Sequence, residues 1–216
     1  MIAKEYRRRD VISFYYGGET IASNKINQAI ADALSSSEER KFVETVEVAI
    51  NLKDVDLQNP QKRISAEVAL PHGRGRPARV AVFAQGEMAV ISKKVVDTVI
   101  SPEQIDELSE NKREARKLAG RFDFFVAETG LMANIGKSLG VVLGPRGKMP
   151  RPIPPQADIE RIIKGLTNLV PVRSKDRPTF HVPIGNVKMT QEQLAENLET
   201  ILKRVESSLD RGYDNI

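Results

Sequence analysis

Pro-His-Gly-Arg-Gly-Arg-Pro at residues 71–77 and Gly-Pro-Arg-Gly-Lys-Met-Pro-Arg-Pro-Ile-Pro-Pro at residues 144–155 are the two stretches of this sequence that are richest in turn residues and arginine. Dense glycine and proline mark loops and breaks in regular structure. The sequence between the two stretches has a different hydrophobic pattern from the sequence outside them. This arrangement predicts one domain inserted into another, with the chain crossing twice between them and hinges near residues 70–73 and 150–155.

Outside the insert, three segments alternate apolar and polar residues. They are residues 42–52, 64–70 and 179–184. Such alternation is typical of strands, usually antiparallel, that bury one face and leave the other open. Residues 1–20 show no clear period and predict a loop or a loosely docked arm.

Two late stretches supply a cover for the buried face. Residues 159–166 and 190–209 carry apolar stripes at helical spacing, and the second begins with the capping-box pattern of Thr190 and Gln193. Residues 1–70 and 156–216 are therefore predicted to form one discontinuous, two-layer α+β domain with an antiparallel, open-faced sheet.

The insert, residues 71–155, has short and nearly continuous apolar runs at 79–84, 98–100 and 122–127. Helical stretches separate and follow these runs, at about 86–95, 102–118 and 129–139. Buried runs that alternate with helices are typical of a parallel sheet covered on both faces. The chain is thus assigned to the α/β class, with two domains, of which the inserted one is Rossmann-like.

The insert invites a comparison with nucleotide-binding enzymes, which is the alternative reading of this chain. Residues 73–78 fit the pattern G-x-G-x-x-A, but they precede the first apolar run instead of following it, so no helix N-terminus receives a pyrophosphate. Gly147 and Lys148 resemble part of a P-loop, yet Met149 stands where magnesium binding needs Ser or Thr. A glycine-rich hinge with solvated arginines is the simpler interpretation.

Other catalytic chemistry finds no support in the residue pattern. The two histidines, His72 and His181, have no cysteine or second histidine at metal-ligand spacing, and no nucleophile turn of the G-x-S-x-G type occurs. We expect a chain that is not an enzyme and that uses no cofactor and no metal.

The composition bears on location and partners. The sequence has no cysteine, no apolar run long enough to span a membrane and no secretory signal, which favours a reducing, cytoplasmic location without a membrane partner. Residues 71–155 carry 14 Lys and Arg against 9 Asp and Glu. A basic insert on a nearly neutral body indicates a polyanionic neighbour.

The open sheet face is the first candidate site. Its polar residues are Thr45, Glu47, Ser65, Glu67 and His181, with Lys41 and Phe42 at its rim. Hydroxyls, carboxylates and an imidazole on a flat face suit hydrogen bonding to RNA 2′-hydroxyls and base edges. An ordinary solvent-facing sheet is the alternative interpretation.

The turn-rich segments are the second candidate site. Prolines hold residues 144–155 extended, so we expect the side chains of Arg146, Lys148 and Arg151 to be exposed and to contact phosphates.

Four stretches resemble the large-subunit ribosomal protein L-one family of archaeal type. The first interdomain segment of the family is similar to residues 70–75, Leu-Pro-His-Gly-Arg-Gly, and its signature before the second crossing to residues 143–150, Leu-Gly-Pro-Arg-Gly-Lys-Met-Pro. Its RNA-binding strand resembles residues 41–48, and the segment before its last helix resembles residues 181–189. The resemblance runs from about residue 22 to residue 216.

The resemblance implies a function that is not enzymatic. The family binds a helix-junction element of large-subunit ribosomal RNA, forms the mobile stalk beside the exit site and helps deacylated tRNA to leave. Several members also bind their own mRNA and repress its translation. We accordingly expect a protein that is monomeric when free and resides on the large ribosomal subunit.

Family positions carry over to individual residues of this sequence. The RNA contacts implied are Lys41, Phe42, Thr45, Glu47, His181, Gly185 and Lys188, and His72, Gly73 and Arg74 lie at the implied hinge. Family members usually end with one more strand, which bears Thr-Met-Gly and contacts RNA. The resemblance places the start of that strand at Asp214-Asn215-Ile216, where the given sequence stops.

Overall fold

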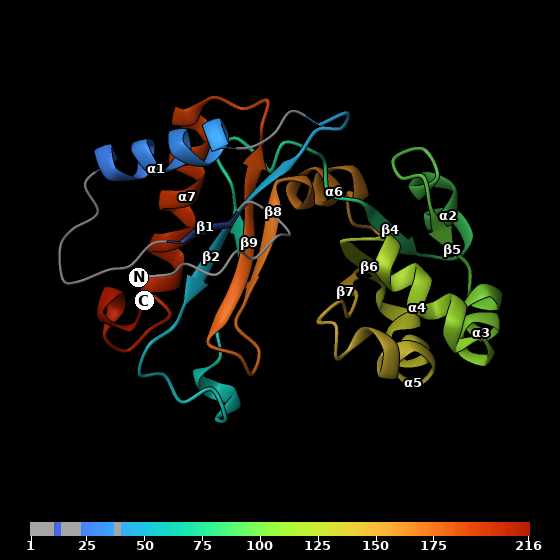
Figure 1. Cartoon of the computed structure of the whole chain (residues 1–216). Helices are drawn as coiled ribbons and strands as arrows, with labels where there is room; N and C mark the ends of the chain where they lie inside the picture. Colours follow the sequence, from blue (N-terminus) through green and yellow to red (C-terminus); the bar gives the residue numbers. More distant parts are fainter. Residues whose placement is uncertain (1–10, 14–22, 37–39) are drawn as a thin grey trace. The chain divides into compact units, whose positions relative to one another are not determined.

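The computed structural model of the chain describes residues 11–13, 23–36 and 40–216 (Figure 1). It divides into two compact units: an outer unit of Met1–Pro77 and Asn168–Ile216, and an inserted unit of Ala78–Thr167. The chain therefore crosses between the units at residues 77–78 and 167–168, later on both sides than the boundaries drawn from the sequence at 70–71 and 155–156. The predicted two-domain α/β fold class is confirmed.

The described residues of the outer unit form two small sheets (Figure 1). In the first, β2 (Thr45–Asn51) pairs antiparallel with β9 (Thr179–Asn186), and β1 (Val11–Ser13) adds a parallel strand at the other edge of β2. In the second, β3 (Ser65–Ala69) pairs antiparallel with β8 (Leu169–Arg173), and β8 lies beside β9.

Both sheets of the outer unit bury one face in a single core. Along β2 the buried side chains are Val46, Val48 and Ile50, and along β9 they are Phe180, Val182 and Ile184. The core is closed by α1 (Ser23–Ser36) and by α7 (Gln191–Glu206), which packs on β9, β3 and α1. Short 3-10 helices at Pro60–Lys62 and Gly212–Asn215 complete this unit.

The sequence signals for α7 are confirmed. Thr190 and Gln193 form the expected capping box, in which each side chain accepts a hydrogen bond from the backbone N–H of the other residue. The exposed first turn and the buried stripe from Leu194 to Val205 then fix which side of the helix faces the sheet.

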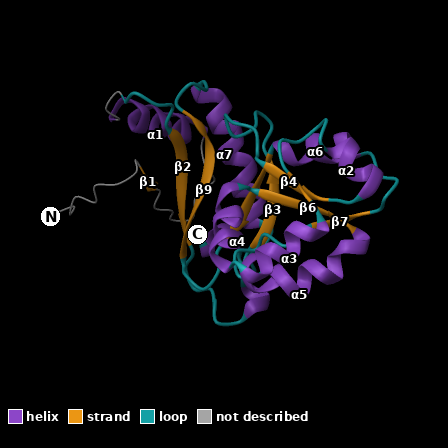
Figure 2. Ribbon diagram, turned by 90° about the vertical axis from the view of Figure 1, so that its right-hand side faces the viewer, coloured by secondary structure: helices purple, strands orange, loops and turns teal. Residues whose placement is uncertain are grey.

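The inserted unit is a three-layer α/β structure (Figure 2). Its sheet consists of four parallel strands in the order β5-β4-β6-β7. The strands are β4 (Val80–Phe83), β5 (Val99–Ile100), β6 (Phe124–Glu128) and β7 (Arg151–Ile153). The side chains of β4 are buried on both faces, which explains the unbroken apolar runs in the sequence.

Helices cover both faces of this parallel sheet. One group packs together on one face: α3 (Pro102–Glu110), α4 (Lys112–Arg121) and α5 (Met132–Leu143), with a 3-10 turn at Thr129–Leu131. The other face carries α2 (Gly86–Ser92) and α6 (Ile159–Thr167), which contact each other (Figure 1).

Several expectations differ from the structure at the level of elements. The helix expected at 102–118 is two helices, because the side chain of Asn111 accepts from Glu114 N and starts α4. The stripe at residues 159–166 predicts a helix that covers the outer sheet, but this helix, α6, lies in the inserted unit. Residues 150–155, expected to be a hinge, contain β7, which hydrogen-bonds to β6 inside the inserted unit.

Candidate nucleic-acid interface

The open face of β2 and β9 presents the polar side chains that the alternation predicts. Thr45 and His181 are exposed and Glu47 is half-buried, while their neighbours in the chain point into the core. Farther along the pair, Thr179 Oγ1 donates to Asn51 Oδ1 across the strands at 2.8 Å. This face therefore offers hydroxyl, carboxylate, imidazole and amide groups from two hydrogen-bonded strands.

Ser65 and Glu67 come from the second sheet. Both are exposed on β3, opposite Arg173 and Pro171 of β8. Because the two sheets bury their other faces in one core, the outward faces of both point away from that core. The five polar residues that the sequence predicts for one open surface thus come from two neighbouring sheets.

A cluster of apolar and cationic side chains lies where β2 begins and β9 ends. Val187 N donates to Glu44 O at 3.2 Å, which joins the segment before β2 to the segment after β9. Phe42 is 64% exposed, an unusual value for a phenylalanine, and the remaining members are exposed as well. We call this group the rim cluster: Lys41, Phe42, Val43, Val187 and Lys188.

Gly185 takes a different position from the other residues expected to contact RNA. A β-bulge between Val46 and Glu47 shifts the register of β9, and Gly185 becomes buried next to Ile184. A Cβ at Gly185 would overlap the side chains of Leu194 and Met189. The structure therefore gives this glycine a packing role, because it lets α7 approach β9 closely.

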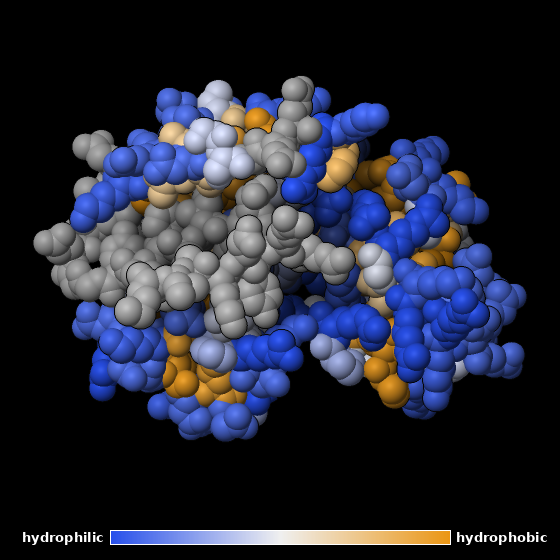
Figure 3. All heavy atoms as spheres, in the orientation of Figure 1, coloured by the Kyte–Doolittle hydropathy of each residue, from blue (hydrophilic) through white to orange (hydrophobic). Residues whose placement is uncertain are grey.

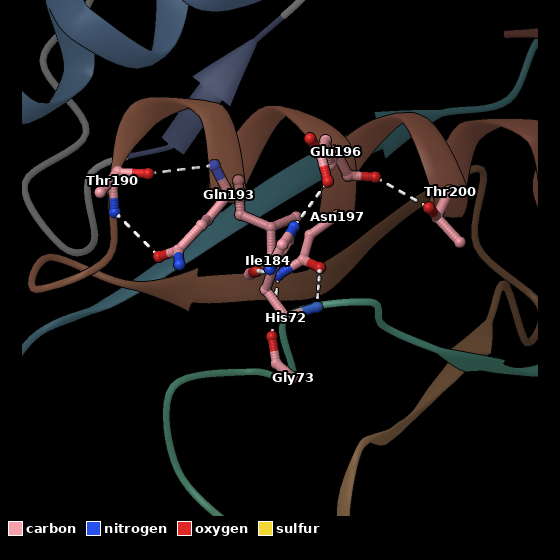
Figure 4. A network of polar contacts seen from close by, with 8 residues as sticks. All are labelled: His72, Gly73, Ile184, Thr190, Gln193, Glu196, Asn197 and Thr200. Carbon is pink, nitrogen blue, oxygen red and sulfur yellow. Dashed lines mark hydrogen bonds and ion pairs between the residues drawn. The ribbon is translucent and has the colours of Figure 1, made fainter.

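The first turn-rich segment is fastened to the outer unit (Figure 4). Asn197 of α7 is completely buried, and its Nδ2 donates to Gly73 O and to Ile184 O, both at 2.8 Å. Its Oδ1 accepts from His72 N at 3.2 Å. The His72 ring lies 2.6 Å from a carboxylate oxygen of Glu196, the residue that precedes Asn197 in the helix.

These contacts correct the hinge expected near residues 70–73. The Asn197 amide holds His72 and Gly73 against the outer unit, and Gly73 adopts a left-handed φ of +64° that closes a turn back to Leu70 O. Arg74 is buried, and its Nε donates to Arg76 O at 3.4 Å, so it is not placed as an exposed phosphate ligand. The crossing itself falls later, at residues 77–78.

Sequence reasoning did not find Asn197, although a signal exists. It lies on the apolar stripe of α7 between Leu194 and Ile201, where a polar residue is buried and must find partners.

The basic residues of the second turn-rich segment mostly serve the inserted unit. Lys148 is half-buried, and its Nζ donates to Ala119 O at 2.8 Å and to Phe122 O at 2.7 Å at the end of α4. Arg151 lies over the ring of Phe124, and burial lowers the pKa of its guanidinium. The expectation that these two side chains are exposed is wrong, because the carbonyls at a helix end and an aromatic face attract them.

Arg146 is the exposed residue among the three basic residues. Its Nη1 donates to Val142 O at 2.9 Å, and the rest of the side chain faces solvent. It stays a candidate phosphate contact.

The inserted unit lacks the electrostatics of a nucleotide site. In sheets of this kind, ligands bind at the carboxyl ends of the strands where the strand order reverses, here β4 and β6. At that point Glu128 Oε2 accepts from Gln85 N at 3.3 Å. A carboxylate therefore takes the backbone N–H and places negative charge where a phosphate would bind.

Residues 11–13, 23–36 and 40–216 contain no group of three or more acidic, histidine or cysteine side chains arranged to hold a metal. Within the same ranges, no helix has the length and apolar character required to cross a membrane. The surface visible in Figure 3 is mainly hydrophilic where it is described.

Comparison with known proteins gives one consistent family. The family model described as the ribosomal protein L1p/L10e family matches residues 34–216. The chain is 50% identical over 192 residues to the large ribosomal subunit protein uL1 of Methanothrix thermoacetophila, which covers 88% of this chain and 91% of that protein. The proteins of the same name from Archaeoglobus fulgidus and Methanocella arvoryzae are 49% and 47% identical, with 88% and 91% of this chain and 89% and 92% of each relative covered. These names denote a ribosomal protein and not an enzyme, in agreement with the sequence analysis.

Proposed function

The chain belongs to the ribosomal protein L1p/L10e family, and from this premise we propose that it is a component of the large ribosomal subunit that binds ribosomal RNA through the open face of its outer unit. The relatives are named as proteins of that subunit. The surface proposed here is the β2–β9 face together with the rim cluster.

The observation that carries the proposal is the exposure of Phe42 in a cluster that also contains two lysines. An aromatic ring with 64% of its surface in solvent loses hydrophobic stabilisation unless a partner covers it. Lys41 and Lys188 lie in the same cluster and supply positive charge. A ring for stacking, ammonium groups for phosphates and the hydroxyl of Thr45 for 2′-hydroxyls together fit folded RNA better than an acidic peptide or a lipid surface.

A more specific role on the ribosome would use the same RNA-binding surface. We propose that the outer unit anchors the protein to RNA at the mobile stalk, while the inserted unit moves and assists release of deacylated tRNA near the exit site. The chain offers a pivot for such movement, because its two crossings lie side by side: Leu70 N donates to Asn168 O in the outer unit and Ala78 N to Thr167 O in the inserted unit. Paired crossings permit rotation but restrain twist.

Translational repression would use the same surface on a different RNA. We propose that the free protein, as a monomer, binds its own mRNA through the β2–β9 face and represses its translation. A ribosomal RNA fragment should then compete with that mRNA for a single site.

The test of the RNA surface is the pair of variants Phe42→Ala and Thr45→Val. Loss of one stacked base is worth about 1–3 kcal/mol, so Phe42→Ala should weaken binding to large-subunit ribosomal RNA by about 5- to 150-fold in a filter-binding titration. Val90→Ala, which truncates an exposed apolar residue of α2 in the inserted unit, is the matched control. Equal affinities for the wild type and Phe42→Ala would remove Phe42 from the site.

Sedimentation tests the wider proposal. The wild-type protein, added to large subunits stripped of this protein, should move with them in a gradient. A protein that acts only as a free repressor would stay in the light fractions.

A further inference from the structure

One side chain fastens two distant cationic segments to each other. Asn186, the last residue of β9, donates from Nδ2 to Gly75 O at 2.9 Å and accepts at Oδ1 from Lys188 N at 3.0 Å. A single planar amide thus lies between the backbone just before Arg76 and the backbone of Lys188. Both of these basic residues are exposed.

The turn that carries Arg76 is held in one conformation. Gly75 has a φ of +78°, and a Cβ there would overlap the side chain of Asn186. The buried Arg74 holds Arg76 O, and Asn197 holds the preceding Gly73. Contacts on both sides of the turn therefore fix where the backbone of Arg76 lies before any partner arrives.

Arg76 and Lys188 belong to the same surface as the β2–β9 face and the rim cluster. Asn186 is the register partner of Thr45 across β2 and β9. Lys188 is a member of the rim cluster that contains Phe42. Arg76 therefore extends that cluster with a residue from the first turn-rich segment, and all of these residues lie in the outer unit.

We propose that Arg76 and Lys188 form a composite phosphate-binding site for the RNA backbone, with Asn186 as its positioning residue. This inference rests on the proposed RNA-binding function and adds a second kind of contact to it. Phe42 stacks on a base, while the guanidinium of Arg76 and the ammonium of Lys188 bind the phosphates that flank it. A fixed backbone lowers the entropy lost on binding, which favours a rigid turn for this purpose.

The experiment measures how RNA affinity depends on salt. The probe is the shortest fragment of large-subunit ribosomal RNA that the wild-type protein protects from nuclease. Each phosphate contact contributes about 0.7–0.9 to the slope of log affinity against log salt concentration. Arg76→Gln and Lys188→Gln should each lower the slope by about one contact, the double variant by about two, and each single variant should weaken binding about two- to fivefold near 0.15 M salt.

The matched control is Arg177→Gln. Arg177 is also an exposed arginine of the outer unit, but it lies just before β9 begins, at the opposite end of the strand from Asn186. Its substitution should leave the slope unchanged. Arg76→Lys should keep the wild-type slope, and thermal unfolding of every variant should match the wild type.

The outcomes separate this inference from the proposed function. If the wild type protects no RNA fragment, the proposed function fails. If Phe42→Ala binds like the wild type, Phe42 is removed from the RNA site. If Phe42→Ala weakens binding but Arg76→Gln has the same salt slope as Arg177→Gln, only the composite phosphate site is overturned.

Discussion

At the scale of single residues, amide side chains hold the proposed RNA surface together more than charged side chains do. Asn197 and Asn186 each join segments that are far apart in the sequence, and each satisfies backbone groups that lie outside the sheet ladders. The charged neighbours of these amides, such as Glu196 beside His72, lie at the surface, where an ion pair stabilises by only about 0–1 kcal/mol. Loss of the buried amide of Asn197 should consequently lower the stability of the protein more than loss of these charged neighbours.

Asn197→Leu should lower the free energy of unfolding by about 2–4 kcal/mol. The substitution keeps the side chain roughly the same size but leaves Gly73 O, Ile184 O and His72 N without their partner, and an unsatisfied buried group costs about 1–3 kcal/mol. Denaturant unfolding followed by circular dichroism measures the change. Thr200→Ala, one turn later on α7, removes only a hydroxyl bond to Glu196 O and should cost less than about 1 kcal/mol. Equal stability of the two variants would contradict the proposed role of Asn197.

At the scale of elements, the ends of helices explain where basic residues go. Lys148 reaches back across the loop after α5 and binds the last carbonyls of α4, which would otherwise have no partner inside the helix. Its place in a proline-rich, basic loop suggests a phosphate ligand, but the structure uses it as a helix cap. The same loop leaves Arg146 exposed, so neighbouring cations of one loop have different roles.

Lys148→Met tests this assignment. Because the change removes a charged donor from two carbonyls at a helix C-terminus, it should destabilise the protein by about 1–3 kcal/mol. The slope of RNA affinity against salt concentration should stay that of the wild type. A lower slope with unchanged stability would instead make Lys148 a phosphate contact.

At the scale of the whole molecule, the two units have separate cores. The outer core joins both small sheets to α1 and α7, and the inserted core joins β4 and β6 to α3, α4 and α5. The chain leaves and re-enters the outer unit at neighbouring positions, since Ala78 N at the first crossing donates to Thr167 O at the second. Under the proposed function, this arrangement would let the outer unit stay on RNA while the inserted unit changes its position.

Replacement of residues 78–167 by a short Gly-Ser linker should leave RNA affinity within about threefold of the full chain. Every residue of the proposed RNA surface, including Arg76 and Lys188, lies in the outer unit, and a few residues suffice to join Pro77 to Asn168. A filter-binding titration with the protected fragment checks this, after circular dichroism has shown that the shortened chain is folded. A loss of a hundredfold or more in a folded protein would assign a direct RNA contact to the inserted unit.

The sequence by itself determined the elements whose signals are local. Alternation along 42–52 and 179–184 reports which side chains face the core, the unbroken apolar runs report a sheet covered on both faces, and Thr190 with Gln193 reports where α7 begins. The strand at 169–173 was missed because Pro171 interrupts its pattern, and β7 was missed because prolines surround Arg151. Only the tertiary structure decided where the chain crosses between units, which cations stay exposed and which glycine faces the core. These outcomes depend on pairs such as Asn197 with Gly73, Asn186 with Gly75 and Lys148 with Ala119, and contacts between residues so far apart in the chain leave no periodic trace in the sequence.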